Sequence, residues 1–178
     1  EVKLKNADYA LFLEINANYH IKQKNWEKVI TYLSKAIKYS RDKKKKVRLT
    51  YIIGQIYHQL EDYKSSYNAF DKVVRMNPEY EFLFNAFLSR ARAFDPKHND
   101  SSKLISEINK MLKDDKNNDY KDQIYFALAE IALKEEEKEQ AIDHLLNATA
   151  NNTGNDQQQS IAHLTLAEIY FNDAEYLS

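Results

Sequence analysis

Apolar residues recur along this chain every three or four positions, the spacing that places side chains on one face of an α-helix. In the stretch "NWEKVITYLSKAIKYS", for example, such residues stand at Trp26, Val29, Leu33 and Ala36. Polar stretches rich in turn-forming residues interrupt the pattern, among them "FDPKHND", "DDKNND" and "NNTGNDQQ". The alternation predicts nine helices, near residues 8–22, 26–41, 47–60, 63–76, 79–94, 101–114, 119–135, 138–151 and 157–172.

Glycine and proline are scarce, with two residues of each in a chain of 178. Tight turns between strands depend on both residues, so their scarcity predicts an all-α fold without strands. Apolar residues make up 43% of the chain, which is enough for a buried core. No apolar run approaches the roughly 20 residues that a membrane-spanning helix needs.

The predicted helices group into pairs that repeat along the chain. In "YIIGQIYHQLEDYKSSYNAFDKVVRMNP", Gly54, Phe70 and Pro78 stand at the spacing of a tetratricopeptide (TPR) repeat, in which two antiparallel helices cross at small residues. The crossing positions along the chain are Ala17, Gly54, Leu88, Ala129 and Ala167, separated by 37, 34, 41 and 38 residues.

This repetition predicts a TPR-type right-handed α-solenoid of about four and a half repeats, a single array over residues 1–178. The repeats are expected near residues 8–44, 47–78, 79–115, 119–152 and 157–178, the last one incomplete. Because the chain begins without methionine and stops inside a repeat, we expect it to be a fragment of a longer chain.

Charge along the chain is balanced, with 26 basic and 27 acidic residues and a net charge of −1. Nucleic-acid-binding proteins need a basic excess to displace counterions from phosphates, so the balance argues against such a partner. The run "RDKKKK" at residues 41–46 is predicted to end a helix and lead into a loop, where cations satisfy the last carbonyls. Cysteine is absent, which excludes disulfides and thiol chemistry.

The sequence offers little support for catalysis. Gly54 and Gly154 lack the motif of a phosphate-binding loop, and the five histidines form no HExxH motif or close pair. No serine stands in the context of a nucleophile elbow. We therefore predict a non-catalytic protein with no cofactor and no metal site. An enzyme whose catalytic part lies outside these residues stays open.

Two predicted helices carry polar and aromatic residues at spacings that place them on one stripe of each helix. In a TPR array these stripes line the concave face, where we expect a protein partner to bind. The predicted partner-binding residues are Arg48, Tyr51, Gln55, His58, Phe82, Asn85, Ser89 and Arg92. TPR arrays that bind chaperone tails grip a terminal carboxylate with lysine and asparagine. Tyr51 and Gln55 depart from that pattern, so we exclude that specific partner.

The two stripes have alternative interpretations. Each is also compatible with an ordinary solvated helix face. Arg90 or Arg92 would then serve only to hold a hairpin together through a salt bridge. The candidate acids for that salt bridge are Asp95 and Glu81.

A narrower set of residues carries a closer resemblance. The set consists of Arg48, Tyr51, Gly54, Gln55, Tyr57, Asn77, Pro78, Tyr80, Glu81, Phe84, Asn85, Ala86 and the run "ARAFD" that follows Arg90. With them, the chain resembles the TPR region of the PorW/SprE family, outer-membrane lipoproteins of Bacteroidetes needed for gliding motility and type IX protein secretion. Flanking stretches such as "LAEIYF" are similar as well, so the resemblance covers most of the chain. Ser66 and Val73 stand where alanine is usual, at packing positions.

The resemblance implies a periplasmic scaffold that contacts other components of the secretion machinery. It also implies association with the outer membrane through a lipid anchor outside these residues, without a membrane span within them. The alternative function is a TPR peptide- or protein-binding module of an unrelated regulatory or assembly system.

Overall fold

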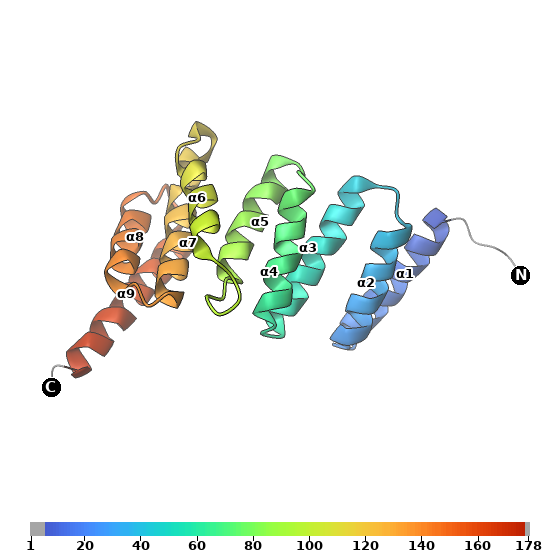
Figure 1. Cartoon of the computed structure of the whole chain (residues 1–178), viewed down its shortest axis with the longest axis horizontal. Helices are drawn as coiled ribbons and strands as arrows, with labels where there is room; N and C mark the ends of the chain where they lie inside the picture. Colours follow the sequence, from blue (N-terminus) through green and yellow to red (C-terminus); the bar gives the residue numbers. More distant parts are fainter. Residues whose placement is uncertain (1–5, 177–178) are drawn as a thin grey trace, which may run out of the picture. The chain divides into compact units, whose positions relative to one another are not determined.

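The structure, a computed structural model, describes the backbone of residues 6–176 and the side chains of residues 6–172. Over this range the chain forms nine α-helices and one 3-10 helix, with no strand (Figure 1). It divides into two compact units, unit 1 ending at Ala93 and unit 2 beginning at Phe94. The predicted all-α fold of helical hairpins is confirmed.

The helix boundaries agree with the predicted ranges to within four residues. Unit 1 contains α1 (Asn6–Lys22), α2 (Trp26–Tyr39), α3 (Lys43–Gln59), α4 (Tyr63–Arg75) and α5 (Tyr80–Arg92). Unit 2 contains α6 (Ser101–Leu112), the 3-10 helix η1 (Asp115–Tyr120), α7 (Lys121–Lys134), α8 (Lys138–Ala150) and α9 (Asp156–Tyr176). The predicted third repeat spans the boundary between the units, so a single continuous array over the whole chain stays a prediction.

The basic run "RDKKKK" begins a helix, and the prediction that it ends one is wrong. α2 ends at Tyr39, and Lys43 is the first residue of α3. Asp42 explains the difference, because its carboxylate accepts hydrogen bonds from the backbone N–H groups of Lys44 and Lys45 at 2.8 and 3.3 Å. An aspartate at this position caps a helix N-terminus and offsets the unfavourable placement of cations in the first turn. The lysines therefore project from the start of a helix.

Gly54 allows α3 and α4 to cross closely. A Cβ atom at this position would lie 2.8 Å from a ring carbon of Phe70, which is too short for a real contact. Ser66, at a position where alanine is usual, is buried and donates its hydroxyl to the Gly54 carbonyl at 2.9 Å. Glycine is thus required because the Phe70 ring occupies the space that any side chain would need.

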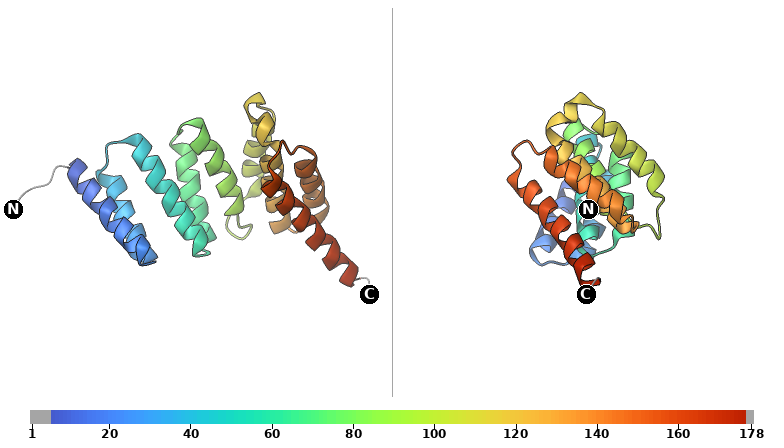
Figure 2. Two further views of the ribbon diagram at one scale, coloured as in Figure 1. Left: turned by 180° about the vertical axis from the view of Figure 1, so that it is seen from behind. Right: turned by 90° about the vertical axis from the view of Figure 1, so that its left-hand side faces the viewer.

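Three hairpins share one turn geometry, in which a residue other than glycine adopts a left-handed backbone. The residues are Lys24 between α1 and α2 (φ 55°), Glu61 between α3 and α4 (φ 60°) and Glu136 between α7 and α8 (φ 62°). In each case the next N–H donates to the carbonyl five residues earlier, at 2.9–3.0 Å. This is the Schellman pattern that ends helices. The same short turn therefore reverses the chain in both units (Figure 2).

A buried arginine joins α4 to α5 in unit 1. Arg90 is 2% exposed, and its Nη1 donates to Asp71 Oδ1 at 2.8 Å. The other carboxylate oxygen of Asp71 accepts from Arg75 Nε at 2.7 Å. The Arg90 guanidinium also lies over the rings of Tyr67 and Phe87, 5.8 and 5.1 Å from their centroids. Arg90 thus has a structural role, through an acid that the sequence did not indicate.

In unit 2, α7 is buried nearly all round. Its buried residues are Asp122, Ile124, Phe126, Ala127, Leu128, Ala129, Ile131 and Ala132. It packs in a hairpin with α8 and also contacts α6, η1 and α9. Figure 2 shows α9 running past the end of α8. Burial raises the pKa of the Asp122 carboxyl, which is 1% exposed, while the N–H groups of Gln123 and Asp122 act in the opposite direction.

Candidate functional site

Five of the eight predicted partner-binding residues line one hollow of about 280 Å³ in unit 1. They are Tyr51, Gln55 and His58 from α3 and Ser89 and Arg92 from α5, and Phe70 from α4 completes the lining. We call this the polar hollow. The helical spacing placed each set on one face of its helix, and the packing of α4 against α3 and α5 brings the two faces together.

The wall of the polar hollow is held by contacts of Tyr51. Its hydroxyl oxygen lies 2.9 Å from Ser89 Oγ, a hydrogen bond that joins α3 to α5. Its ring meets the ring of Phe70 edge-on, with centroids 5.2 Å apart, and that of Phe82 with centroids 6.1 Å apart. These contacts fix the orientation of the tyrosine before any partner binds.

Of the other polar side chains of the hollow, two are exposed and one is half-buried. Gln55 is exposed, and its side-chain amide makes no hydrogen bond to another residue that the structure describes. Arg92 is also exposed, while His58 is half-buried with its ring 5.4 Å from that of Tyr63. An amide offers both a donor and an acceptor, and a guanidinium offers several donors in a plane. The hollow can therefore bind peptide groups and carboxylates.

The remaining three predicted residues lie outside the polar hollow. Arg48 and Phe82 line a neighbouring hollow of about 510 Å³. Asn85 is exposed, and its Nδ2 donates to the Glu81 carbonyl at 2.9 Å within its own helix. The structure thus brings five residues together, with Arg48 and Phe82 close by along α3 and α5.

The sequence did not indicate Phe70 as a site residue, because an aromatic residue at this helical spacing is usually part of the buried core. It is indeed only 2% exposed, yet it lines the polar hollow. The sequence feature that could have pointed to Phe70 is Gly54, since a glycine at a helix crossing leaves space for the aromatic ring of the facing helix.

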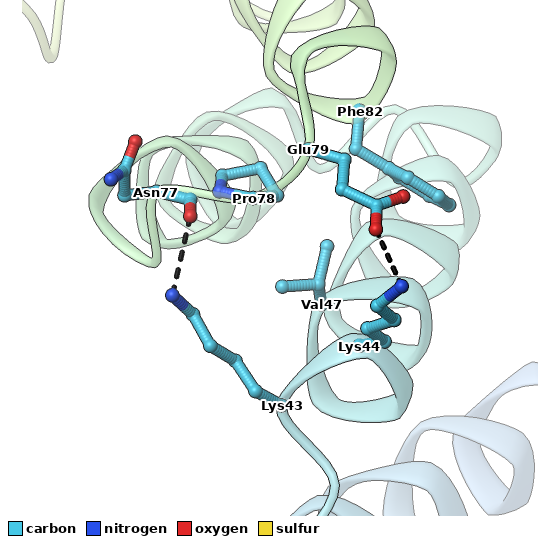
Figure 3. Close-up of a pocket in the computed structure, with 7 residues that line it drawn as sticks. All are labelled: Lys43, Lys44, Val47, Asn77, Pro78, Glu79 and Phe82. Carbon is cyan, nitrogen blue, oxygen red and sulfur yellow. Dashed lines mark hydrogen bonds and ion pairs between the residues drawn. The ribbon is translucent and has the colours of Figure 1, made fainter.

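A third hollow of about 350 Å³ lies between the first turn of α3 and the turn that leads from α4 to α5 (Figure 3). Its apolar side is formed by Val47, Pro78 and Phe82, and Lys43 and Lys44 reach over its edge. We call it the lysine-rimmed hollow. The sequence did not indicate it, because the basic run was assigned to the end of a helix.

The part of the chain that the structure describes holds no candidate metal site and no candidate membrane-spanning helix. No group of three histidine, aspartate or glutamate side chains is placed there to hold a metal ion. None of the helices in residues 6–176 combines the length and the apolar character that crossing a membrane requires.

Comparison with known families supports the repeat pattern. The tetratricopeptide repeat family matches residues 47–80, which comprise most of α3, all of α4 and the turn before α5. No curated protein matches the chain. The chain therefore contains a TPR repeat, as the pattern around Gly54 predicts. This repeat is a protein–protein interaction module, and its helical fold typically serves as a non-enzymatic scaffold.

Proposed function

We propose that this protein is a non-catalytic scaffold that binds a protein partner through the polar hollow of unit 1. The observation that carries the proposal is the convergence of the Gln55 amide and the Arg92 guanidinium, both exposed, beside a tyrosine that Ser89 and two aromatic rings hold in place. Preorganised aromatic and arginine side chains are the residues that most often dominate protein–protein binding energy.

An extended segment of the partner fits the chemistry of the polar hollow. The Gln55 amide can pair with the N–H and C=O groups of an extended backbone, and Arg92 can form charge-assisted hydrogen bonds to a carboxylate or carbonyl. A hollow of about 280 Å³ admits one side chain, so flanking residues of α3 and α5 would supply the rest of the contact area.

The experiment is site-specific photo-crosslinking followed by affinity measurement. A photoreactive residue at position 55 should crosslink a partner that the same residue at position 23 does not, since Gln23 is exposed in the turn between α1 and α2 and does not line the hollow. With the identified partner, Gln55→Ala with Arg92→Ala should weaken binding by about tenfold or more. The matched pair Gln23→Ala with Arg41→Ala, also exposed, should leave it unchanged.

Folding must be monitored in the same variants. Circular dichroism and thermal melting should be the same for both double variants, because all four side chains are exposed. If both pairs weaken binding equally, or the tested pair acts only by lowering stability, the polar hollow is not the binding site.

The proposed setting is the type IX secretion and gliding machinery of Bacteroidetes. The support is the residue combination of the PorW/SprE family around Asn77, Pro78, Asn85 and Arg90. The full-length protein would then be a periplasmic component held at the outer membrane by a lipid anchor, and its partners would be other parts of the secretion machinery.

Fractionation and genetics test this setting. The tagged full-length protein should be recovered with the outer membrane and should incorporate labelled fatty acid. Deleting its gene should block secretion of type IX cargo. The Gln55→Ala, Arg92→Ala gene should fail to restore secretion at normal protein levels. Recovery in another compartment, or normal secretion in the deletion strain, would assign the scaffold to an unrelated regulatory or assembly system.

A further inference from the structure

The lysine-rimmed hollow offers an apolar surface that is open at the molecular surface and continuous with the core. Val47 belongs to a buried cluster with Val73 and Ala86, and Phe82 packs against that cluster while remaining half-buried. Pro78, in the turn before α5, adds a rigid apolar edge (Figure 3). An apolar side chain that enters the hollow would therefore extend an existing core cluster and leave water.

The cations beside this apolar surface are only partly neutralised. Lys43 Nζ donates to the carbonyl of Asn77 at 3.3 Å, a neutral acceptor, and no carboxylate in the described part of the chain pairs with it. Arg48, farther along α3, is exposed and makes no hydrogen bond or ion pair with a described residue. Lys44 pairs with Glu79, but their side chains are 80% and 67% exposed, so this pair is weak and can open.

Lys43 and Arg48 line two hollows that adjoin each other. Lys43 lines the lysine-rimmed hollow, and Arg48 lines the adjoining hollow of about 510 Å³. Both hollows share Lys44 and Phe82, so they meet along the same edge of α3. A ligand crossing that edge would meet a cation, an apolar surface and a second cation. Two carboxylates also line the adjoining hollow, and each is already engaged, Glu14 with Lys45 and Asp42 as the cap of α3.

We propose that this edge of α3 binds an acidic peptide segment in which one aliphatic or aromatic side chain stands between carboxylates. The apolar side chain enters the lysine-rimmed hollow, one carboxylate binds Lys43 and another binds Arg48. A volume of about 350 Å³ accommodates a leucine or phenylalanine side chain. The inference rests on the proposed function, because it assigns the chemistry of the partner segment next to the polar hollow.

The charge pattern favours a peptide over a nucleic acid. Two of the lysines at the start of α3 already face acids, Lys44 through Glu79 and Lys45 through Glu14 at 3.1 Å. A phosphate backbone would have to pass these two carboxylates, whereas separate carboxylates on a peptide can be spaced to reach Lys43 and Arg48. Association should be faster and tighter at low ionic strength, since the contacts lie at the surface.

The experiment uses a set of fluorescein-labelled peptides of nine residues with both ends capped. Each carries two acidic residues and one leucine or phenylalanine at varied spacing, and binding to the full chain is measured by fluorescence anisotropy. Capping removes the terminal carboxylate, so only side-chain carboxylates are tested. At least one spacing should bind, and replacing its apolar residue by serine should weaken binding about tenfold.

Two charge-reversal variants locate the binding edge. Lys43→Glu should abolish binding of that peptide, and it should leave folding intact because an acidic residue in the first turn suits the helix dipole. Lys28→Glu makes the same change of net charge at an exposed site on α2 and should have little effect.

Several results would overturn the inference. They are the absence of binding by every spacing, equal losses in the two lysine variants, no effect of the serine replacement, or stronger competition by single-stranded DNA than by acidic peptide. The proposed function is judged separately. If the Lys43→Glu variant binds the crosslinked partner normally while the Gln55→Ala, Arg92→Ala variant does not, the proposed function is supported and this inference is wrong.

Discussion

Units 1 and 2 each bury a charged side chain almost completely, and the surroundings of the two charges differ. Arg90 in unit 1 is 2% exposed and Asp122 in unit 2 is 1% exposed. Arg90 has an acid, Asp71, at hydrogen-bond distance and aromatic rings nearby. Asp122 has no cation paired with it among the described residues, and burial raises its pKa.

The difference shows that burying a charged side chain to the same extent can stabilise the folded state of one unit and destabilise that of the other. A buried charge with a partner holds two elements in one arrangement, but removing the partner is costly. A buried carboxyl without a cation favours its neutral form, so it opposes folding wherever the unfolded chain would ionise it. Burial alone therefore does not reveal the role of a charged residue.

The largest effect is expected at the partner of Arg90. Asp71→Ala leaves the guanidinium buried without this carboxylate and should lower the free energy of unfolding by about 3 kcal/mol. For a chain of this size, that loss corresponds to a fall in Tm of roughly 6–12 °C, measured by circular dichroism.

Arg75→Ala is the matched control for Asp71→Ala. It removes the other cation that contacts Asp71, but the Arg75 side chain is 74% exposed and should contribute about 0.5 kcal/mol or less. Equal losses in the two variants would mean that the Arg90 pair is not what joins α4 to α5.

A smaller loss is expected when the buried cation itself is removed. Arg90→Met keeps much of the apolar length and leaves Asp71 with Arg75 and partial solvent contact, at 19% side-chain exposure. The loss of the ion pair and of the ring contacts should cost about 1–2 kcal/mol, measured by urea unfolding. A loss larger than that of Asp71→Ala would show that the packing of the arginine chain matters more than its charge.

A stabilising effect smaller than either loss is expected at Asp122. The pKa of the Asp122 carboxyl is higher in the folded chain than its ordinary value of 3.8. The carboxyl therefore begins to oppose folding as the pH rises above 3.8, and its opposition is complete once the pH exceeds the folded-state pKa. Asp122→Asn should therefore raise Tm at pH 7 and have no such benefit near pH 3. Asp115→Asn, at an exposed position of η1, is the control and should be neutral at both pH values. A gain independent of pH would exclude desolvation as its cause.

The smallest expected effect on stability should be equal in the two units, because it concerns a turn of the same geometry that occurs once in each. Glu61→Gly and Glu136→Gly relieve a left-handed backbone that glycine adopts freely. Glycine also loses more entropy on folding, which leaves a net gain of about 0.5 kcal/mol each, measured by urea unfolding. A gain in one unit and a loss in the other would show that the glutamate side chains do more than occupy the turn.

Helix positions were predictable because apolar periodicity is local, whereas the buried ion pair was not. Arg90 and Asp71 are 19 residues apart and lie on helices whose relative rotation no spacing rule supplies. The sequence suggested Asp95 or Glu81 for this role, since both are close in the chain. The start of α3 was misassigned for a related reason, as Asp42 could be read either as a loop residue or as a helix cap.

The candidate site was predictable in part. Spacing alone placed Tyr51, Gln55 and His58 on one stripe of α3, and the structure brings Ser89 and Arg92 to the same hollow. The lysine-rimmed hollow could not be predicted from the sequence, because it depends on how the turn before α5 approaches the first turn of α3.

The order of helix packing in unit 1 has a consequence for the rate of folding. The principal contacts join consecutive helices, α1 with α2, α2 with α3, α3 with α4 and α4 with α5. Each contact therefore closes only a short loop, and proteins rich in such local contacts fold in microseconds to milliseconds. Either of the two hairpins of unit 1, α1 with α2 or α3 with α4, can form first, and the other can then pack against it. Trp26 is the only tryptophan in the chain and packs against a core cluster to which α1, α2, α3 and α4 all contribute. Stopped-flow or temperature-jump measurement of its fluorescence would therefore follow the formation of this shared core.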